Sequence, residues 1–311
     1  MRTHIYSHST LLLADRGMAL FTCILTPKHK PIQAVVCFCH GYMDHPTLTR
    51  RKELCRLVQQ GIAVIMLEQA GHGRSDGALG LIENWDHVVD DTCDFFSQTL
   101  LEQERFSEKP CFLMGESMGG AVAYCTYRRL PTLFHRGVVL LCPMCKISED
   151  LLPSPEIIRW FRRVVGRKEE PTTWLGFLPL APSKGNAFAE YCCKDSKKFQ
   201  LLSAFSPLEY GPRTKPRLAT ARELLDATRF ITMDLSNFDA PVLIQHGLDD
   251  KITDPKLSQA LYHESPSPDK TLKLYEGMWH SLIGGETDEN VDLVLNDSIQ
   301  WILDRASEKR N

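Results

Sequence analysis

A Gly-x-Ser-x-Gly motif centred on Ser117 is the feature that most restricts how this chain can fold. An apolar run at 110–114 leads directly into the motif, and a helix-compatible segment at 121–129 follows it. This order predicts a strand, a sharp turn and a helix, the context that exposes a serine hydroxyl at the carboxyl edge of a sheet as a nucleophile. Gly115 and Gly119 flank Ser117 where a side chain would collide with the turn. The plainer alternative is a glycine-rich turn between a strand and a helix.

Strand and helix patterns alternate along most of the chain. Continuous apolar runs predict buried strands at 33–39, 62–67, 110–114, 137–142, 241–246 and 271–275. Helical patterns occur at 48–60, 85–103, 121–130, 255–263 and 290–306, and a turn signal at 15–17 predicts an N-terminal hairpin of strands 10–14 and 18–25. Strands that are apolar on both faces are typical of a parallel sheet covered by helices on each side. The sequence therefore predicts an α/β fold with a mostly parallel central sheet.

The alternation stops between residues 146 and 236. This segment is rich in proline and aromatic residues and contains no convincing buried strand, whereas the strand pattern resumes at residue 241. We predict a core formed by residues 1–145 and 237–311, interrupted after the sixth strand by a helical cap formed by residues 146–236.

An acidic pair and a histidine follow the last two predicted strands, in the order that a serine nucleophile requires. A serine hydroxyl needs a neighbouring base that is itself oriented by a third group, and in folds of this kind the chain order is serine, acid, histidine. Asp249 and Asp250 follow the strand at 241–246, and His280 follows the last strand. Taken singly these residues have plainer explanations, a solvated turn and a packed histidine. Together they predict a catalytic triad with His280 as base and either aspartate as acid.

The oxyanion formed during acyl transfer also needs hydrogen-bond donors. The backbone N–H of Met118, directly after the serine, and that of Tyr42, on the loop after the strand at 33–39, are the predicted donors. An alternative interpretation of His40 and His45 on the same loop is that they bind a metal, but no second cluster of ligand residues supports this. We therefore expect no metal and assign these histidines to bracing the loop. Asp254, directly before Pro255, is expected to cap a helix.

Composition excludes several other functions. The net charge of −3 and a pI near 6.4 do not favour nucleic-acid binding. Eleven scattered cysteines argue against a disulfide framework, and the Cys-x-x-Cys at 142–145 has no second pair to complete a zinc site. No apolar run reaches 18 residues and no apolar signal core begins the chain, so we expect a cytoplasmic protein. The glycine-rich loop at 71–77 could hold phosphate, but it lacks the third glycine and the lysine of such loops and is better explained as a turn.

These motifs resemble the monoglyceride lipase family of serine hydrolases, in particular its plant-type branch of monoacylglycerol lipases, lysophospholipases and caffeoylshikimate esterases. The resemblance runs from about residue 12 to residue 303 and is carried by the segments 40–42, 71–75, 115–120, 143–148, 215–218, 246–255, 277–280 and 285–292. It implies a cofactor-free α/β-hydrolase fold with a mobile cap and an oxyanion hole at Tyr42 and Met118. In the family the acid lies four residues before the Asp-Pro of the next helix, which selects Asp250 over Asp249. Two departures are Met43, where glycine is common, and Glu68 in place of aspartate.

The expected substrate is a small lipid ester. Trp160, Phe161 and Trp174 in the cap and Trp279 beside the histidine are candidate substrate-binding residues, although they could simply pack the cap onto the core. An aromatic and basic cap would also suit peripheral membrane contact. We expect hydrolysis of monoacylglycerols or lysophospholipids. The alternatives are an acyltransferase with the same acyl-enzyme, a phenolic esterase of the caffeoylshikimate type, and a non-catalytic ligand-binding relative. Nothing in the sequence indicates the oligomeric state.

Overall fold

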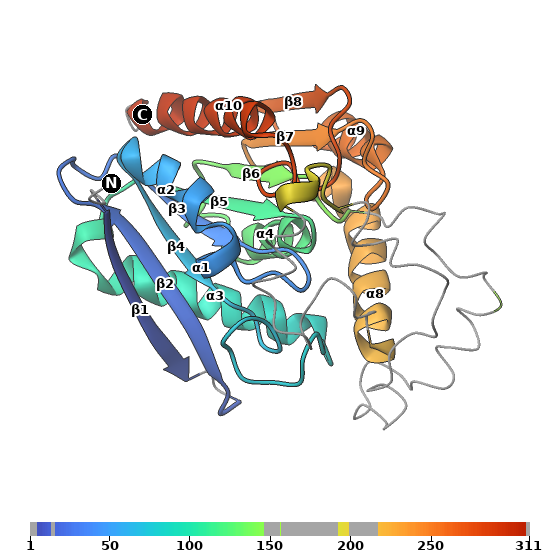
Figure 1. Ribbon diagram of the computed structural model, residues 1–311, viewed down its shortest axis with the longest axis horizontal. Helices are drawn as coiled ribbons and strands as arrows, with labels where there is room; N and C mark the ends of the chain where they lie inside the picture. Colours follow the sequence, from blue (N-terminus) through green and yellow to red (C-terminus); the bar gives the residue numbers. More distant parts are fainter. Residues whose placement is uncertain (1–4, 14–15, 146–155, 157–191, 199–216, 309–311) are drawn as a thin grey trace.

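An eight-stranded sheet forms the centre of the computed structural model, which describes residues 5–13, 16–145, 156, 192–198 and 217–308 (Figure 1). The strands are β1 (Ile5–Leu13), β2 (Ala19–Pro27), β3 (Ala34–Cys39), β4 (Ile62–Leu67), β5 (Cys111–Glu116), β6 (Val138–Leu141), β7 (Val242–Gly247) and β8 (Lys270–Tyr275). Their order in the sheet is β1-β2-β4-β3-β5-β6-β7-β8. The β1–β2 and β2–β4 pairs are antiparallel and the others are parallel, which confirms the predicted mostly parallel sheet.

The helices lie close to the predicted segments. They are α1 (Pro46–Thr49), α2 (Arg51–Gln59), α3 (Trp85–Glu102), α4 (Met118–Arg129), α8 (Leu218–Asp234), α9 (Pro255–Glu264) and α10 (Asp288–Ser307), with one-turn 3-10 helices η1 (Glu104–Phe106) and η4 (Leu235–Asn237). The single helix predicted at 48–60 is wrong in one respect, because Arg50 leaves the helical conformation with φ −116° and divides it into α1 and α2. Asp254 caps α9 as predicted, since its side chain accepts the N–H of Lys256.

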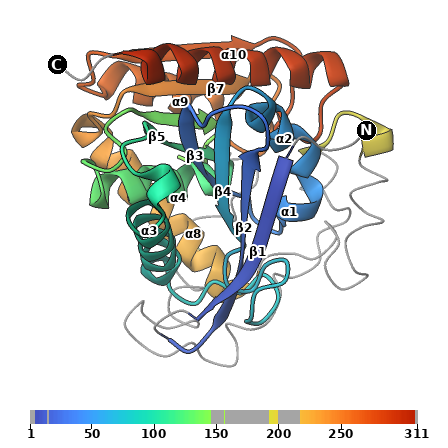
Figure 2. The ribbon, with the colours of Figure 1, turned by 90° about the vertical axis from the view of Figure 1, so that its left-hand side faces the viewer.

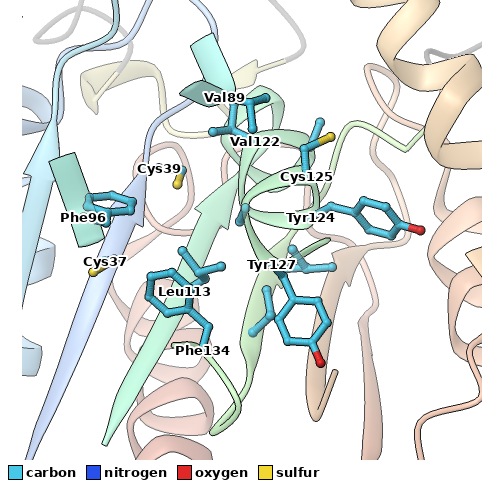
Figure 3. Packing of buried hydrophobic residues seen from close by; sticks show 14 of the residues in the cluster. Cys37, Cys39, Val89, Phe96, Leu113, Val122, Tyr124, Cys125, Tyr127 and Phe134 are labelled. Carbon is cyan, nitrogen blue, oxygen red and sulfur yellow. The ribbon is translucent and has the colours of Figure 1, made fainter. Parts of the chain in front are cut away.

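Alternate residues of the central strands enter two separate apolar layers. Val35 and Cys37 of β3 face the layer that includes α3, α4 and α8, whereas Val36 and Phe38 face the layer that includes α2 and α10. Figure 2 shows α3 and α4 on one side of β3 and β4 and α2 on the other. Figure 3 shows part of the first layer, in which side chains from β3, β5, α3 and α4 pack together. Burial on both faces explains why these strands are apolar at every position.

Helix α8 lies within the range 146–236 that the sequence predicts as a cap. Its residues Leu224, Ala227 and Ile231 are buried in the same apolar layer as α3 and α4, so this helix packs with the core. Trp160, Phe161 and Trp174 lie outside the described residues, as does most of that range. The division into core and cap therefore stays a prediction.

All eleven cysteines are free, and most of them are buried. Among the described helices none is both long and apolar enough to cross a membrane.

Candidate active site

The turn between β5 and α4 holds Ser117 in a strained conformation. Its φ of 57° and ψ of −121° belong to a region that residues other than glycine rarely adopt, at a cost on the order of 1–3 kcal/mol. A Cβ at Gly115 would collide with the carbonyl of Gly119, and one at Gly119 would collide with the carbonyl of Cys39. Glycine is therefore needed on both sides of the serine for the turn to close against β3.

Three side chains distant in sequence form one hydrogen-bonded chain at the carboxyl edge of the sheet. The hydroxyl of Ser117 lies 2.8 Å from Nε2 of His280, and Nδ1 of His280 lies 2.7 Å from Oδ2 of Asp250. Ser117 follows β5, Asp250 follows β7 and His280 follows β8. The carboxyl ends of parallel strands meet at one edge, which is why these loops converge. Ser117 is 9% exposed, Asp250 8% and His280 3%.

The structure places Asp250, and not Asp249, against the histidine. Oδ1 of Asp250 accepts the backbone N–H of Ile252 at 2.7 Å and that of Thr253 at 3.1 Å, while Oδ2 faces His280. The side chain of Asp249 is exposed. The two oxygens of Asp250 therefore have separate tasks, one fixing the carboxylate and the other contacting the imidazole.

A second histidine, His246, also contacts the carboxylate, although no role was predicted for it. Nε2 of His246 lies 3.1 Å from Oδ2 of Asp250, and Nδ1 of His246 lies 2.7 Å from the hydroxyl of Ser258. Because an ionised carboxylate only accepts, Nε2 carries a proton and donates it to Asp250, while Nδ1 forms its hydrogen bond with the Ser258 hydroxyl. The hydroxyl of Thr253 donates to the same carboxylate oxygen at 2.8 Å. The signal available in the sequence was its position at the end of the predicted strand at 241–246, four residues before Asp250.

Charges along this hydrogen-bonded chain shift the pKa values of Asp250 and His280 in opposite directions. Burial alone raises the pKa of Asp250, but the nearby His280 and the hydrogen bonds from His246 and His280 outweigh it and hold the pKa well below its usual range. Burial alone lowers the pKa of His280, but the charge and hydrogen bond of Asp250 outweigh it, so the pKa is raised above 6.5. The site therefore keeps an ionised acid beside a histidine of increased basicity.

The loop after β3 lies directly against the serine. A Cβ at Gly41 would stand 3.4 Å from Cβ of Ser117, so the backbone that leads into Tyr42 passes close to the hydroxyl. Met118 is the first residue of α4, and the first N–H groups of a helix have no partner within it. The hydroxyl of Tyr42 donates to the carbonyl of Gly80 at 2.8 Å, which holds the loop.

The sequence of this chain matches the model of a known protein family. Residues 30–288 match the model of the Hydrolase_4 family, described as serine aminopeptidase, S33. The chain belongs to this family. It is 33% identical to caffeoylshikimate esterase from Arabidopsis thaliana over 287 residues, 92% of this chain and 82% of that protein. It is 26% identical to monoglyceride lipase from Rattus norvegicus over 298 residues, 96% of this chain and 90% of that protein.

The fold comparison agrees with the family. The solved structure of a soluble variant of monoglyceride lipase from Saccharomyces cerevisiae superimposes with a TM-score of 0.80 at 21% identity, covering 98% of this chain and 96% of that one. The predicted resemblance and the α/β-hydrolase fold are thus confirmed, and this Hydrolase_4 member is a serine hydrolase of carboxylic esters.

Met43, where the family commonly has glycine, adopts φ 59°. This is the left-handed region that glycine enters without strain, which gives the physical reason for glycine at that position. The other departure, Glu68, is fully buried and accepts the N–H of Arg74 at 2.7 Å. Neither Met43 nor Glu68 takes part in the hydrogen bonds that join Ser117, His280 and Asp250.

His40 braces the loop after β3. Nε2 of His40 accepts the N–H of Gln69 at 2.9 Å, so its proton is on Nδ1, which donates to the carbonyl of Gly41 at 2.8 Å. Burial lowers the pKa of His40, in keeping with this neutral form. Both ring nitrogens are engaged, which leaves neither for a metal.

Cys142, His246 and Asp250 present possible ligand atoms within 4.8 Å of one another. Burial and the charge of Asp250 raise the pKa of the Cys142 thiol well above its usual value, and Nε2 of His246 points its proton at Asp250. A cysteine binds a metal as the thiolate and a histidine through an unprotonated ring nitrogen, so this group fits hydrogen bonding better than metal binding.

The glycine-rich loop at 71–77 uses its amides internally. The N–H groups of Gly71, His72, Ser75 and Asp76 all donate to backbone carbonyls. A phosphate-binding loop points such groups at its ligand instead, so the interpretation as a structural turn agrees with the hydrogen bonds.

The raised pKa of His280 predicts the pH dependence of hydrolysis. His280 can act as a base only when it is neutral, so activity is lost as the pH falls through its pKa. We expect kcat/KM for a soluble short-chain ester to fall about tenfold per pH unit on the acid side, with a midpoint above 6.5. Initial rates between pH 5 and 9, with a check for reversible recovery, measure this. A midpoint below 6.5 would contradict the assignment.

Proposed function

We propose that this protein hydrolyses the ester bond of monoacylglycerols, or of lysophospholipids, through an acyl-enzyme on Ser117 and without a cofactor. The observation that carries the proposal is the continuous hydrogen-bonded chain from Ser117 through His280 to Asp250. The monoglyceride lipases among the relatives support a small lipid ester as substrate.

The contacts support a stepwise mechanism. The oxygen of Ser117 attacks the ester carbonyl while Nε2 of His280 takes its proton, and Asp250 holds the imidazole in the required tautomer. The N–H groups of Met118 and Tyr42 bind the oxyanion, where losing one donor typically costs about 2.7–4 kcal/mol of transition-state stabilisation. His280 then protonates the departing alcohol. A water molecule, deprotonated by His280, finally releases the fatty acid from Ser117.

Aromatic residues named in the sequence analysis provide further support for this substrate class. Trp279 directly precedes His280 and is half-buried, and its backbone N–H donates to Oε1 of Glu286 at 2.7 Å. We propose that Trp279, together with Trp160, Phe161 and Trp174, lines the acyl chain. A phenolic ester is the second candidate, favoured by the 33% identity to caffeoylshikimate esterase.

A substrate panel distinguishes these candidates. We expect purified protein to turn over 2-monoacylglycerol or lysophosphatidylcholine with a kcat/KM at least about tenfold above that for caffeoylshikimate, since apolar contacts discriminate substrates by such factors. Product analysis with added glycerol or lysolipid tests for acyl transfer. A clear preference for caffeoylshikimate would overturn the lipid assignment, and acyl-glycerol as the main product would indicate a transferase.

We also propose a cytoplasmic protein that contacts membranes peripherally through the cap. The free thiols support a reducing compartment. Sedimentation with lipid vesicles tests the membrane contact, and a protein that stays in the supernatant would rule it out.

A further inference from the structure

A buried ion cluster lies directly behind the candidate triad. Nε of Arg50 lies 3.0 Å from Oε2 of Glu116, and its Nη2 lies 3.1 Å from the hydroxyl of Ser281 and 3.4 Å from Oδ2 of Asp44. The side chains of Arg50 and Glu116 are 9% and 4% exposed. One guanidinium therefore reaches three partners that come from different parts of the chain.

Each partner adjoins a residue of the proposed chemistry. Glu116 directly precedes the nucleophile, Ser281 directly follows the histidine, and Asp44 lies on the loop that carries Tyr42. The hydroxyl of Ser281 also donates to Oε1 of Glu116 at 3.3 Å. Asp44 in turn holds its own loop, because its N–H donates to the carbonyl of Gly41 at 3.2 Å.

The cluster requires the planar fork of arginine. A guanidinium presents several N–H groups in fixed directions, whereas the ammonium of lysine is a point charge on a flexible stem. The guanidinium also packs closely against the loop after His280, since a Cβ at Gly284 would collide with it. Arg50 stands at the break between α1 and α2, where the chain leaves the helical conformation.

We propose that Arg50 is a positioning residue that fixes the nucleophile turn, the histidine loop and the oxyanion loop relative to one another. The inference rests on the proposed function of the same site. A buried ion pair can often be replaced by apolar groups without loss of stability. Stability alone therefore does not explain the ion pair of Arg50 and Glu116. The contacts of Arg50 with all three loops give this residue a role in positioning the catalytic groups.

The charged groups around His280 make the proposal testable by more than loss of activity. Burial lowers the pKa of His280, Asp250 and Glu116 raise it, and Arg50 lowers it. The nearby Cys193 is a neutral thiol, because burial raises its pKa to about 11. Removing the charge of Glu116 and removing that of Arg50 should therefore shift the acid limb of the pH–rate profile in opposite directions.

Four variants separate the possible roles. Glu116→Gln keeps an acceptor for Arg50 and should move the acid limb to lower pH, whereas Arg50→Met should move it to higher pH. Arg50→Lys keeps the charge but loses the fork. We expect its kcat to fall about 10–100-fold, the size of effect that small misplacements produce, with KM and the acid limb nearly unchanged. Ser281→Ala removes only a bridging hydroxyl, and we expect a several-fold fall in kcat at unchanged KM.

Thermal unfolding of each variant shows which of them fold. If Arg50→Met and Arg50→Lys do not fold, Glu116→Gln and Ser281→Ala decide the matter. Variants that melt at lower temperature but keep the wild-type kcat and acid limb would show a merely structural role and overturn the proposal. The proposed function would survive that result, since it fails only if the wild-type protein hydrolyses none of the esters in the panel.

Discussion

Replacing Ser117 with alanine should lower kcat for ester hydrolysis by about 10⁶-fold, the size of loss seen when a serine nucleophile is removed. The hydroxyl that lies 2.8 Å from Nε2 of His280 would be absent, so no acyl-enzyme could form. The activity that remains would come from the oxyanion donors and substrate binding alone. The measurement is kcat on the ester that the wild-type protein hydrolyses fastest.

The Ser117→Ala variant should still fold. Alanine keeps the Cβ that already tolerates φ 57°, and a lost hydrogen bond costs about 0.5–1.5 kcal/mol. A fluorophosphonate probe, which reacts with activated serines, should label the wild-type protein and the control variant Ser97→Ala but not Ser117→Ala. Ser97 lies on α3, where its hydroxyl donates to the carbonyl of Asp94 in the same helix. A wild-type protein that remains unlabelled would favour the non-catalytic alternative.

The central fold was predictable because its pattern is local. Strands β3, β4 and β6 are apolar at every position, and such runs need only their own residues to be recognised. The break at Arg50 was not predictable, because nothing nearby ends the helix. The residue at the break, Arg50, has two of its side-chain partners 66 and 231 residues further along the chain, at Glu116 and Ser281.

The candidate site was predictable to a similar extent. Ser117 and His280 follow from a turn motif and the order of strand ends, and the structure brings them together. The choice between Asp249 and Asp250 did not follow from the residues themselves, and only the spacing seen in the resembling family selected Asp250. The position of His246, at the end of a strand and four residues before Asp250, did not by itself reveal their contact, because that contact depends on how the loop after β7 folds back.

Replacing Asp250 with asparagine should lower kcat by about 10⁴-fold while leaving the site assembled, as expected when the orienting acid of a triad becomes an amide. The backbone N–H groups of Ile252 and Thr253 both donate to Oδ1. These donors require an oxygen at that position in the variant. The new NH₂ group must then stand where Oδ2 stood, against His280.

The amide would impose the wrong tautomer on His280. An NH₂ group donates, so Nδ1 of His280 would have to accept and the proton would move to Nε2, where it faces the hydroxyl of Ser117. The base would then be unable to take the proton of the nucleophile. His246 can adapt, because its Nε2 can accept from the amide while its Nδ1 donates to Ser258. The loss should therefore be in kcat and not in folding.

Asp249→Asn is the matched control, because it makes the same chemical change one residue away on an exposed side chain. It should keep kcat within about twofold of wild type, since surface changes away from a site have small effects. Thermal unfolding of both variants and kcat across the pH range provide the measurements. If Asp249→Asn loses activity and Asp250→Asn keeps it, the acid is misassigned. If neither loses activity, Oδ2 of Asp250 does not orient His280, and the 2.7 Å contact between them has no part in the chemistry.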